Sequence, residues 1–284
     1  MNIRTVAIIG AGVMGSDTAL DIACYGYNVI LKDLNTEILK EAEERIKQSF
    51  RMIKMMKKEL CELKQEDVLP HIVFQTDYKG FENVDIVIEN IVEVWESKKA
   101  EYKRLKEVCK PETLFAVNTS CISITKIGSL LPDTSKVIGT HFMNPVPMKK
   151  MVEVIRGFHT SQDTEDRITD FLKSLGKNPV VVNDCPGFVS NRLSHLFMNE
   201  AAFLVQDQVA SPSQIDMIFK QGFGHKMGPL ETADLIGLDT VVNSLNILYE
   251  SFQDNKFRCC PLLKKMVDAG LLGKKSGKGF YDYK

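Results

Sequence analysis

The sequence predicts an α/β fold in which a doubly wound sheet is followed by an all-α C-terminal domain. Three observations predict it. Strand-like apolar runs alternate with helical stretches up to about residue 185, which is typical of parallel sheets. A glycine-rich turn follows the first apolar run, where doubly wound sheets bind their ligands. Beyond the segment Cys185-Pro186-Gly187, only helical patterns follow.

Eight apolar runs predict the strands of the first domain. They span 3–9, 28–31, 72–75, 85–89, 114–118, 136–141, 151–155 and 179–182. Helices are predicted between the early strands, over 13–25, 36–63 and 96–109. This βαβ alternation favours a parallel sheet, although the later strands need not be parallel.

The second domain is predicted to be entirely helical. Its helical patterns cover 192–208, 213–219, 231–252 and 261–269. Ser211-Pro212-Ser213 is typical of a helix start, because serine caps helix N-termini and proline suits the first turn. We therefore predict a domain boundary between residues 185 and 186.

Composition and charge exclude several classes of protein. The 284 residues are 44% hydrophobic and 26% charged, with a formal net charge of −1, which is typical of a soluble globular protein without a nucleic-acid surface. No apolar run reaches the roughly 18 residues of a membrane span, and the N-terminus does not resemble a signal peptide. The seven cysteines lack metal-binding spacing, so we expect reduced thiols, a cytoplasmic protein and no metal.

The segment after the first strand matches a Rossmann-type dinucleotide fingerprint, GAGVMG, at residues 10–15. Gly10 permits the tight turn that leaves the strand. Gly12 has no side chain, so the backbone can approach a pyrophosphate. Gly15 lets the following helix lie close to the strand. The alternative is a tight turn in an ordinary α/β domain that binds no nucleotide.

The rest of the fingerprint predicts the cofactor. The helix beginning near Val13 directs the unpaired N–H groups of its first turn, including Met14, at phosphate groups. Asp33 ends the second strand, where a carboxylate accepts hydrogen bonds from a ribose diol and repels a 2′-phosphate. The cofactor is therefore predicted to be NAD and not NADP, although the adjacent Lys32 weakens this preference.

A histidine lies at the carboxyl end of a predicted strand, where α/β sheets place their chemistry. This residue, His141, belongs to the segment HFMNPVP, and Glu153 follows inside the apolar run MVEVI. A buried carboxylate needs a partner, so we predict that Glu153 orients His141 and stabilises its cation. Such a pair supplies the base that NAD-linked alcohol oxidation requires. The alternative is a structural histidine.

Polar residues follow other predicted elements. Asn118 and Ser120 follow the fifth strand, and Asn191 lies at the start of the second domain. Asn118 is a candidate cofactor contact. Ser120 and Asn191 are candidates for binding a substrate hydroxyl or carbonyl. The alternative is that both are helix caps, a frequent role of serine and asparagine.

The long helix predicted over 36–63 ends in a basic segment. Arg51, Lys54 and Lys58 are spaced to share one helix face. Such a face is usually only solvated. The alternative is a contact for a phosphate-bearing substrate carrier.

The chain resembles the family of NAD-dependent L-3-hydroxyacyl-CoA dehydrogenases, which includes bacterial 3-hydroxybutyryl-CoA dehydrogenases. The resemblance covers essentially the whole chain and rests on GAGVMG, IENIVE, VNTSCISIT, HFMNPVP, CPGFVSNR, MGPLETADLIGLDT and GKKSGKGFYDY. It implies a Rossmann-type NAD-binding domain (1–185) and a helical substrate and dimerisation domain (186–284). It also implies a homodimer and a thioester substrate.

The resemblance further implies roles for the polar residues. The family's catalytic pair falls on His141 and Glu153. Its substrate-binding serine and asparagine fall on Ser120 and Asn191. Asn144 matches the asparagine of the family's His-Phe-x-Asn-Pro motif.

Other family positions surround the cofactor and the coenzyme. Glu89, Glu93 and Lys98 match positions that line the nicotinamide side of the cleft. The helix after the second strand helps to hold the CoA nucleotide in this family, which favours Arg51 and Lys54 as substrate contacts.

Several residues depart from the family pattern. Asp17 stands where the family usually has glycine, and Met143 replaces a phenylalanine. A carboxylate at position 17 suits the helix dipole but would repel phosphate, so we expect it to face away from the cofactor. The departures resemble a branch found in polyketide biosynthesis, which is thought to oxidise a 3-hydroxyacyl group, such as a glyceryl thioester, on an acyl carrier protein.

The sequence therefore predicts reversible oxidation of a short (S)-3-hydroxyacyl thioester to the 3-oxoacyl thioester, with 3-hydroxybutyryl-CoA favoured as substrate. One alternative is the same reaction on an acyl carrier protein, whose acidic surface would suit the basic segments. Another is an NAD-binding regulatory protein without activity. Neither a nucleic acid nor a membrane is expected as a partner.

Overall fold

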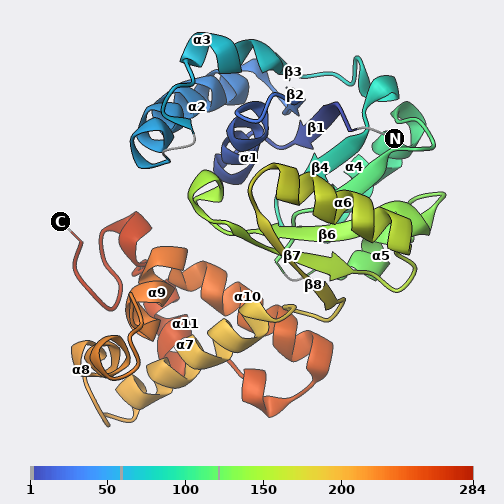
Figure 1. Cartoon of the computed structure of the whole chain (residues 1–284). Coiled ribbons are helices and arrows are strands. Elements are labelled where there is room, and N and C mark those ends of the chain that lie inside the picture. Colours follow the sequence, from blue (N-terminus) through green and yellow to red (C-terminus); the bar gives the residue numbers. More distant parts are fainter. Residues whose placement is uncertain (1–2, 58–59, 121, 284) are drawn as a thin grey trace. The chain divides into compact units, whose positions relative to one another are not determined.

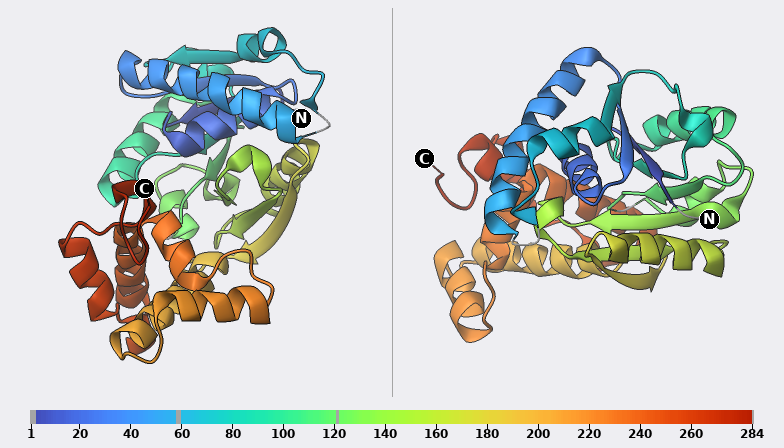
Figure 2. Two further views of the ribbon diagram at one scale, coloured as in Figure 1. Left: turned by 90° about the vertical axis from the view of Figure 1, so that its left-hand side faces the viewer. Right: turned by 45° about the horizontal axis from the view of Figure 1, so that its top comes forward.

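The computed structural model describes residues 3–57, 60–120 and 122–283 (Figure 1). The chain forms two compact units, Met1–Asp184 and Cys185–Lys284. The first unit contains a sheet with helices on both faces, and the second is helical (Figure 2). This architecture confirms the predicted fold class.

The sheet of the first unit has eight strands in the order β3-β2-β1-β4-β5-β6-β7-β8. The strands are β1 (Thr5–Ile9), β2 (Asn28–Lys32), β3 (Ile72–Gln75), β4 (Ile86–Glu89), β5 (Leu114–Val117), β6 (Val137–Phe142), β7 (Met151–Arg156) and β8 (Asn178–Asn183). All neighbours are parallel except β6 and β7, which are antiparallel. Each strand lies where the sequence predicted one.

The helices of the first unit are α1 (Val13–Ala23), α2 (Thr36–Met56), α3 (Gln65–Val68), α4 (Trp95–Val108), α5 (Ile124–Gly128) and α6 (Gln162–Ser174). The prediction of one helix over 36–63 is wrong, because α2 ends at Met56 and Lys57 is extended. Lys58, the third member of the predicted basic face, lies outside the described residues. The sequence analysis missed α6, although the cap Ser161 and the acidic first turn mark its start.

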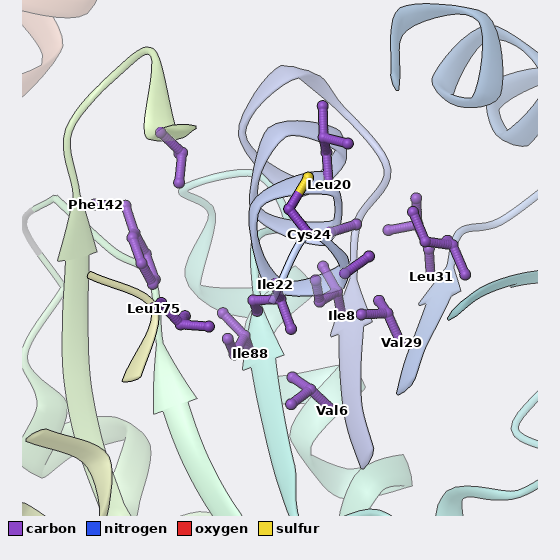
Figure 3. Close-up of a cluster of buried hydrophobic side chains, with 14 of the residues drawn as sticks. Val6, Ile8, Leu20, Ile22, Cys24, Val29, Leu31, Ile88, Phe142 and Leu175 are labelled. Carbon is purple, nitrogen blue, oxygen red and sulfur yellow. The ribbon is translucent and has the colours of Figure 1, made fainter. Parts of the chain in front are cut away.

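Both faces of the sheet are buried, which explains why its strands are continuous apolar runs. Val6 and Ile8 of β1 pack with Leu20 of α1 in one cluster (Figure 3). The side chains of Leu20 and Ile8 are fully buried, and burying one such side chain contributes about 1.5–3 kcal/mol. On α4, Tyr102 contacts Phe115 of β5. The packing on both sides holds the carboxyl ends of the strands in place.

The second unit consists of α7 (Ser190–Gln206), α8 (Pro212–Met217), α9 (Pro229–Ile236), α10 (Leu238–Phe252) and α11 (Pro261–Asp268), with a π-helical turn over Ile218–Gly222. The single helix predicted over 231–252 is wrong, because Gly237 adopts a φ of 103° and separates α9 from α10. Glycine tolerates this conformation because it lacks Cβ. The predicted start at Ser211 is confirmed by a capping box with Gln214.

The C-terminal tail is attached to this unit by a buried carboxylate. Asp234 accepts hydrogen bonds from the backbone N–H groups of Phe280 and Tyr281 and from the hydroxyl of Tyr283. The tail motif GKGFYDY therefore has a structural role in the second unit. Within the described part of the chain, no helix combines the length and apolarity that crossing a membrane requires.

Candidate active site

The antiparallel pairing of β6 with β7 places His141 directly opposite Glu153. The imidazole Nδ1 lies 2.9 Å from a carboxylate oxygen of Glu153. Both residues are buried, with 8% and 3% of their surface exposed. A carboxylate beside Nδ1 favours the tautomer that carries its proton there, so Nε2 is left to accept a proton. The predicted pairing of the two residues is therefore present.

Ser120 lies on the other side of the imidazole. Its Oγ is 3.4 Å from Nε2 of His141, at the carboxyl end of β5. The alternative that Ser120 is a helix cap is wrong, because Ser123 caps α5 by accepting a hydrogen bond from the N–H of Lys126. The Nε2 atom of His141 and the Ser120 hydroxyl are thus close enough to act on one substrate oxygen.

Glu93 holds the turn that carries Ser120. One of its carboxylate oxygens accepts hydrogen bonds from the Thr119 hydroxyl and from the N–H groups of Ser120 and Ile122, the last two at 3.1 and 3.2 Å. The other oxygen lies 3.6 Å from Nζ of Lys98. Glu93 therefore fixes the position of Ser120 through the backbone of this turn.

A buried ion pair supports the neighbouring loop. Nζ of Lys98 lies 2.8 Å from each carboxylate oxygen of Glu89, and neither side chain is exposed. Glu89 also accepts a hydrogen bond from the N–H of Ile91 at 2.8 Å. Burial raises the pKa of Glu89, and the charge of Lys98 opposes that rise. The pair therefore anchors the segment between β4 and α4, on which Glu93 lies.

Two amide side chains join the carboxyl ends of three strands. The Asn118 Oδ1 atom accepts a hydrogen bond from the N–H of Phe142 at 3.3 Å, and its Nδ2 donates to Oδ1 of Asn90 at 2.5 Å. Phe142 directly follows His141, so this chain of amides supports the strand end that presents the imidazole. Sequence reasoning missed Asn90, although its place directly after β4 was a usable signal.

The glycine-rich loop has the shape that a pyrophosphate needs. A Cβ at Gly10 would lie 2.6 Å from the backbone oxygen of Asn90, and one at Gly15 would clash with the Gly10 carbonyl. A Cβ at Gly12 would meet no atom within 4 Å, so the space beside this residue is open. In the part of the chain that the structure describes, no side chain caps the N-terminus of α1. Its orphan N–H groups, including those of Val13 and Met14, therefore suit an anion.

Asp33 contacts this loop directly. Its carboxylate accepts hydrogen bonds from the N–H of Ala11 at 2.5 Å and from that of Leu34 at 2.6 Å. The neighbouring Lys32 is buried and points elsewhere, since its Nζ lies 3.1 Å from the Tyr78 hydroxyl and 3.7 Å from Glu101. Lys32 therefore does not weaken the preference for NAD, because its charge is already paired.

Comparison with known proteins identifies the family. Residues 5–185 match the family model "3-hydroxyacyl-CoA dehydrogenase, NAD binding domain", and residues 187–283 match "3-hydroxyacyl-CoA dehydrogenase, C-terminal domain". The chain belongs to the 3-hydroxyacyl-CoA dehydrogenase family. The resemblance on which the sequence analysis relied is therefore confirmed, as is its assignment of NAD as cofactor.

Individual relatives agree with this family. The chain is 43% identical to a probable 3-hydroxybutyryl-CoA dehydrogenase of Bacillus subtilis, over 100% of this chain and 98% of the relative. It is 42% identical to a 3-hydroxybutyryl-CoA dehydrogenase of Clostridioides difficile, over 98% and 99% of the two chains. The crystal structure of (S)-3-hydroxybutyryl-CoA dehydrogenase from Ralstonia eutropha matches with a TM-score of 0.93 and 38% identity, over 100% of both chains.

Asn144, predicted to bind substrate in this dehydrogenase, lies on the loop that follows β6. Asn144 is exposed, two residues beyond β6. The loop after it is held by Lys177, whose Nζ donates to the carbonyls of Val146 and Lys149 at 2.6 and 3.1 Å.

The two predicted substrate contacts on α2 are separate from the imidazole. Arg51 and Lys54 lie in the last two turns of the helix, and among the described residues neither contacts His141. The next basic residue, Lys57, pairs with Asp21 at 3.3 Å.

Asn191 belongs to the second unit of the dehydrogenase. It is the second residue of α7, and the N-cap position is Val189. The alternative that Asn191 caps this helix is therefore wrong. Its backbone oxygen lies 2.8 Å from Nδ1 of His195, which fixes the first turn of α7.

Proposed function

We propose that this chain interconverts (S)-3-hydroxybutyryl-CoA and acetoacetyl-CoA with NAD as the hydride carrier. The observation that carries the proposal is the group of His141, Glu153 and Ser120 at the carboxyl edge of the sheet. The relatives reported above, whose names specify 3-hydroxybutyryl-CoA, support the choice of substrate.

His141 acts as the general base. Its Nε2 takes the proton of the substrate's 3-hydroxyl group. NAD, when bound, supplies the acceptor for the hydride on the carbon that bears this hydroxyl. Glu153 holds Nδ1–H and balances the positive charge that the imidazole gains. In the reverse direction the protonated His141 returns the proton to the oxygen of the 3-oxo group.

Ser120 positions the reacting oxygen, and Asn191 is assigned to substrate binding because it matches the family's substrate-binding asparagine. Ser120 is suited to this role because its hydroxyl lies within reach of the atom that exchanges the proton. We assign Asn144 to substrate binding on the family motif alone.

Cofactor binding belongs to the first unit. The backbone of the loop at Gly10, Gly12 and Gly15 and the first turn of α1 hold the pyrophosphate, and Asp33 binds the adenosine ribose. We assign the contacts on the nicotinamide side of the cofactor, and the support of the residues that make them, to four residues: Glu89, Glu93, Lys98 and Asn118.

We assign to the two domains the roles that the sequence predicts. Residues 1–185 form the NAD-binding domain, and 186–284 form the substrate and dimerisation domain. The family resemblance implies a homodimer, and exposed apolar side chains of the second unit are candidates for its interface, among them Leu193 at 64% and Phe223 at 68% exposure. Light scattering should give twice the 32.0 kDa mass of one chain. A monomeric mass would contradict the dimer.

We propose coenzyme A as the carrier and the cytoplasm as the location. Arg51 and Lys54 are the basic residues assigned to the carrier's phosphates. The described cysteines are free thiols, which suits a reducing compartment. Turnover should be higher with 3-hydroxybutyryl-CoA than with the same acyl group on an acyl carrier protein. The opposite order would support the carrier-protein alternative.

The test of the reaction is His141→Gln, with NADH oxidation by acetoacetyl-CoA followed by absorbance. We expect kcat to fall by about 10²-fold to 10⁴-fold, the usual contribution of a general base. The dissociation constant of NADH should not change, because the fingerprint is intact. Wild-type turnover in this variant would overturn the proposed role of His141, and a wild-type protein that binds NADH without turnover would support the regulatory alternative.

A further inference from the structure

The first turns of α1 contain a carboxylate, Asp17, close to the end of the helix that receives the cofactor phosphates. Asp17 is only 7% exposed. The Ser49 hydroxyl of α2 donates a hydrogen bond to its Oδ1 at 3.2 Å. The side chain therefore faces α2, whereas the sequence predicted only that it would face away from the cofactor. Its negative charge nevertheless remains near the helix N-terminus and lowers the positive potential there.

A cation on α2 lies beside the same loop. Nη1 of Arg45 donates hydrogen bonds to the carbonyl of Ala11 at 3.3 Å and to Oγ of Ser16 at 3.2 Å. The Ser16 hydroxyl in turn donates to the Ala11 carbonyl at 2.8 Å. Arg45 is one helical turn before Ser49, so both residues project from one face of α2 towards the start of α1.

Most of the guanidinium is still available. An arginine carries five N–H donors in a planar fork, which matches a phosphate group well. Apart from the two hydrogen bonds of Nη1, the Arg45 donors have no hydrogen-bond partner within residues 3–57, 60–120 and 122–283. The group is half-buried, so its charge is less screened than that of a fully exposed side chain.

The glycine-rich loop is held through both backbone groups of Ala11. The Ala11 N–H donates to Asp33, and the Ala11 carbonyl accepts from Arg45. The Arg45 charge also favours the ionised form of Asp17, whose pKa burial raises. The positive charge of Arg45 therefore offsets the negative charge of Asp17. Arg45 also contacts the Ala11 carbonyl, which belongs to the glycine-rich loop that approaches the pyrophosphate.

We propose that Arg45 is a further cofactor-binding residue of this dehydrogenase. It fixes the glycine-rich loop through the Ala11 carbonyl and supplies to the NAD pyrophosphate the positive charge that Asp17 removes. Asp17 and Arg45 then form a compensating pair. Asp17 of α1 lowers the positive potential at the anion site, and Arg45 of α2 restores it.

Direct titration of NADH, followed by its fluorescence at low salt, tests the proposal. Arg45→Met should raise the dissociation constant of NADH about fivefold, as expected for loss of one partly exposed charge contact. Asp17→Asn should lower it, and the double variant should return it close to the wild-type value.

A matched control removes the same charge from the same helix. Lys47 on α2 pairs with Glu43 and Glu44 at 2.8 Å and has no contact with the loop among the described residues. Lys47→Met should leave NADH affinity unchanged. Equal dissociation constants for Arg45→Met and Lys47→Met would overturn the proposal.

Two further measurements distinguish a variant that does not fold from one that folds but binds NADH weakly. Thermal unfolding of each variant shows whether folding is affected, and Arg45→Lys keeps the charge without the fork if Arg45→Met does not fold. Wild-type affinity in Arg45→Lys together with weak binding in Arg45→Gln supports the role of charge, whereas wild-type affinity in both contradicts it. Absence of NADH binding by the wild-type protein would contradict the assigned cofactor and not this proposal alone.

Discussion

Replacing Glu153 by glutamine tests the charge of the carboxylate beside His141. Glutamine has nearly the same shape, and its side-chain oxygen can still accept the hydrogen bond from Nδ1. The neutral imidazole should therefore keep its position and tautomer. The substitution removes only the negative charge, which matters once the imidazole has taken a proton.

The size of the effect follows from the geometry. The Nδ1 and carboxylate oxygen atoms are 2.9 Å apart, and the two side chains are 10% and 4% exposed. A hydrogen bond to a charged group contributes about 1.5–3 kcal/mol, and about 1.36 kcal/mol corresponds to a tenfold change in rate. Glu153→Gln should therefore reduce kcat about 10-fold to 150-fold, with the dissociation constant of NADH unchanged.

The assay is steady-state reduction of acetoacetyl-CoA with NADH, beside thermal unfolding and NADH titration. Glu165→Gln is the matched control, because Glu165 is a largely buried carboxylate that pairs at 3.3 Å with Arg156, in the same strand as Glu153. The control should keep wild-type kcat. A Glu153→Gln variant that folds and turns over within about threefold of the wild type would refute the reasoning, as would an equal loss in the control.

Four other predictions concern the glycine-rich loop and the buried charged side chains. Gly12→Ala should fold normally, because a Cβ there meets nothing within 4 Å, yet weaken NADH binding. Gly15→Ala should lower the unfolding temperature, because its Cβ would clash with a carbonyl of the loop. Lys98→Met should lower the free energy of unfolding in urea by about 3–5 kcal/mol, since it leaves the Glu89 charge buried and unpaired, and adding Glu89→Gln should restore most of the loss. Burial raises the pKa of Asp17 above 3.8, so the folded protein holds this proton more tightly than the unfolded chain does. This contribution to stability is therefore lost as pH rises from about 3.8 through the folded pKa, above which Asp17 is ionised. Asp17→Asn should remove that part of the pH dependence in unfolding titrations, and an unchanged profile would show that this carboxyl is not perturbed.

Local patterns predicted most of the fold. The apolar runs of β1 to β8 are continuous because both faces of the sheet are buried, and that signal needs no knowledge of distant contacts. Helix α6 was missed, and two predicted helix boundaries were wrong where a single residue ends a helix. Gly237 divides α9 from α10, and the turn at Lys57 ends α2 before the predicted residue 63. Helical periodicity continues across such points, so the pattern alone does not show them.

The site was predicted in part. His141 and Glu153 were found from the cost of burying a charge in an apolar run, and their antiparallel register then explains how they meet. Asn90 was missed although it lies within the motif IENIVE, and Arg45 was missed because it belongs to no motif. Each acts through a contact with a distant segment.

By itself, the sequence determined the positions of the strands along the chain, the glycine-rich turn, the acid that ends β2 and the residue types of the catalytic group. These depend on side-chain periodicity and on the backbone freedom of single residues, which are local properties. The tertiary structure alone decided that Lys32 is paired away from the loop, that Asp17 faces α2 and that Arg45 reaches Ala11. Those outcomes depend on which charges the packing of α1, α2 and the sheet brings within a few ångströms, and no spacing along the chain encodes them.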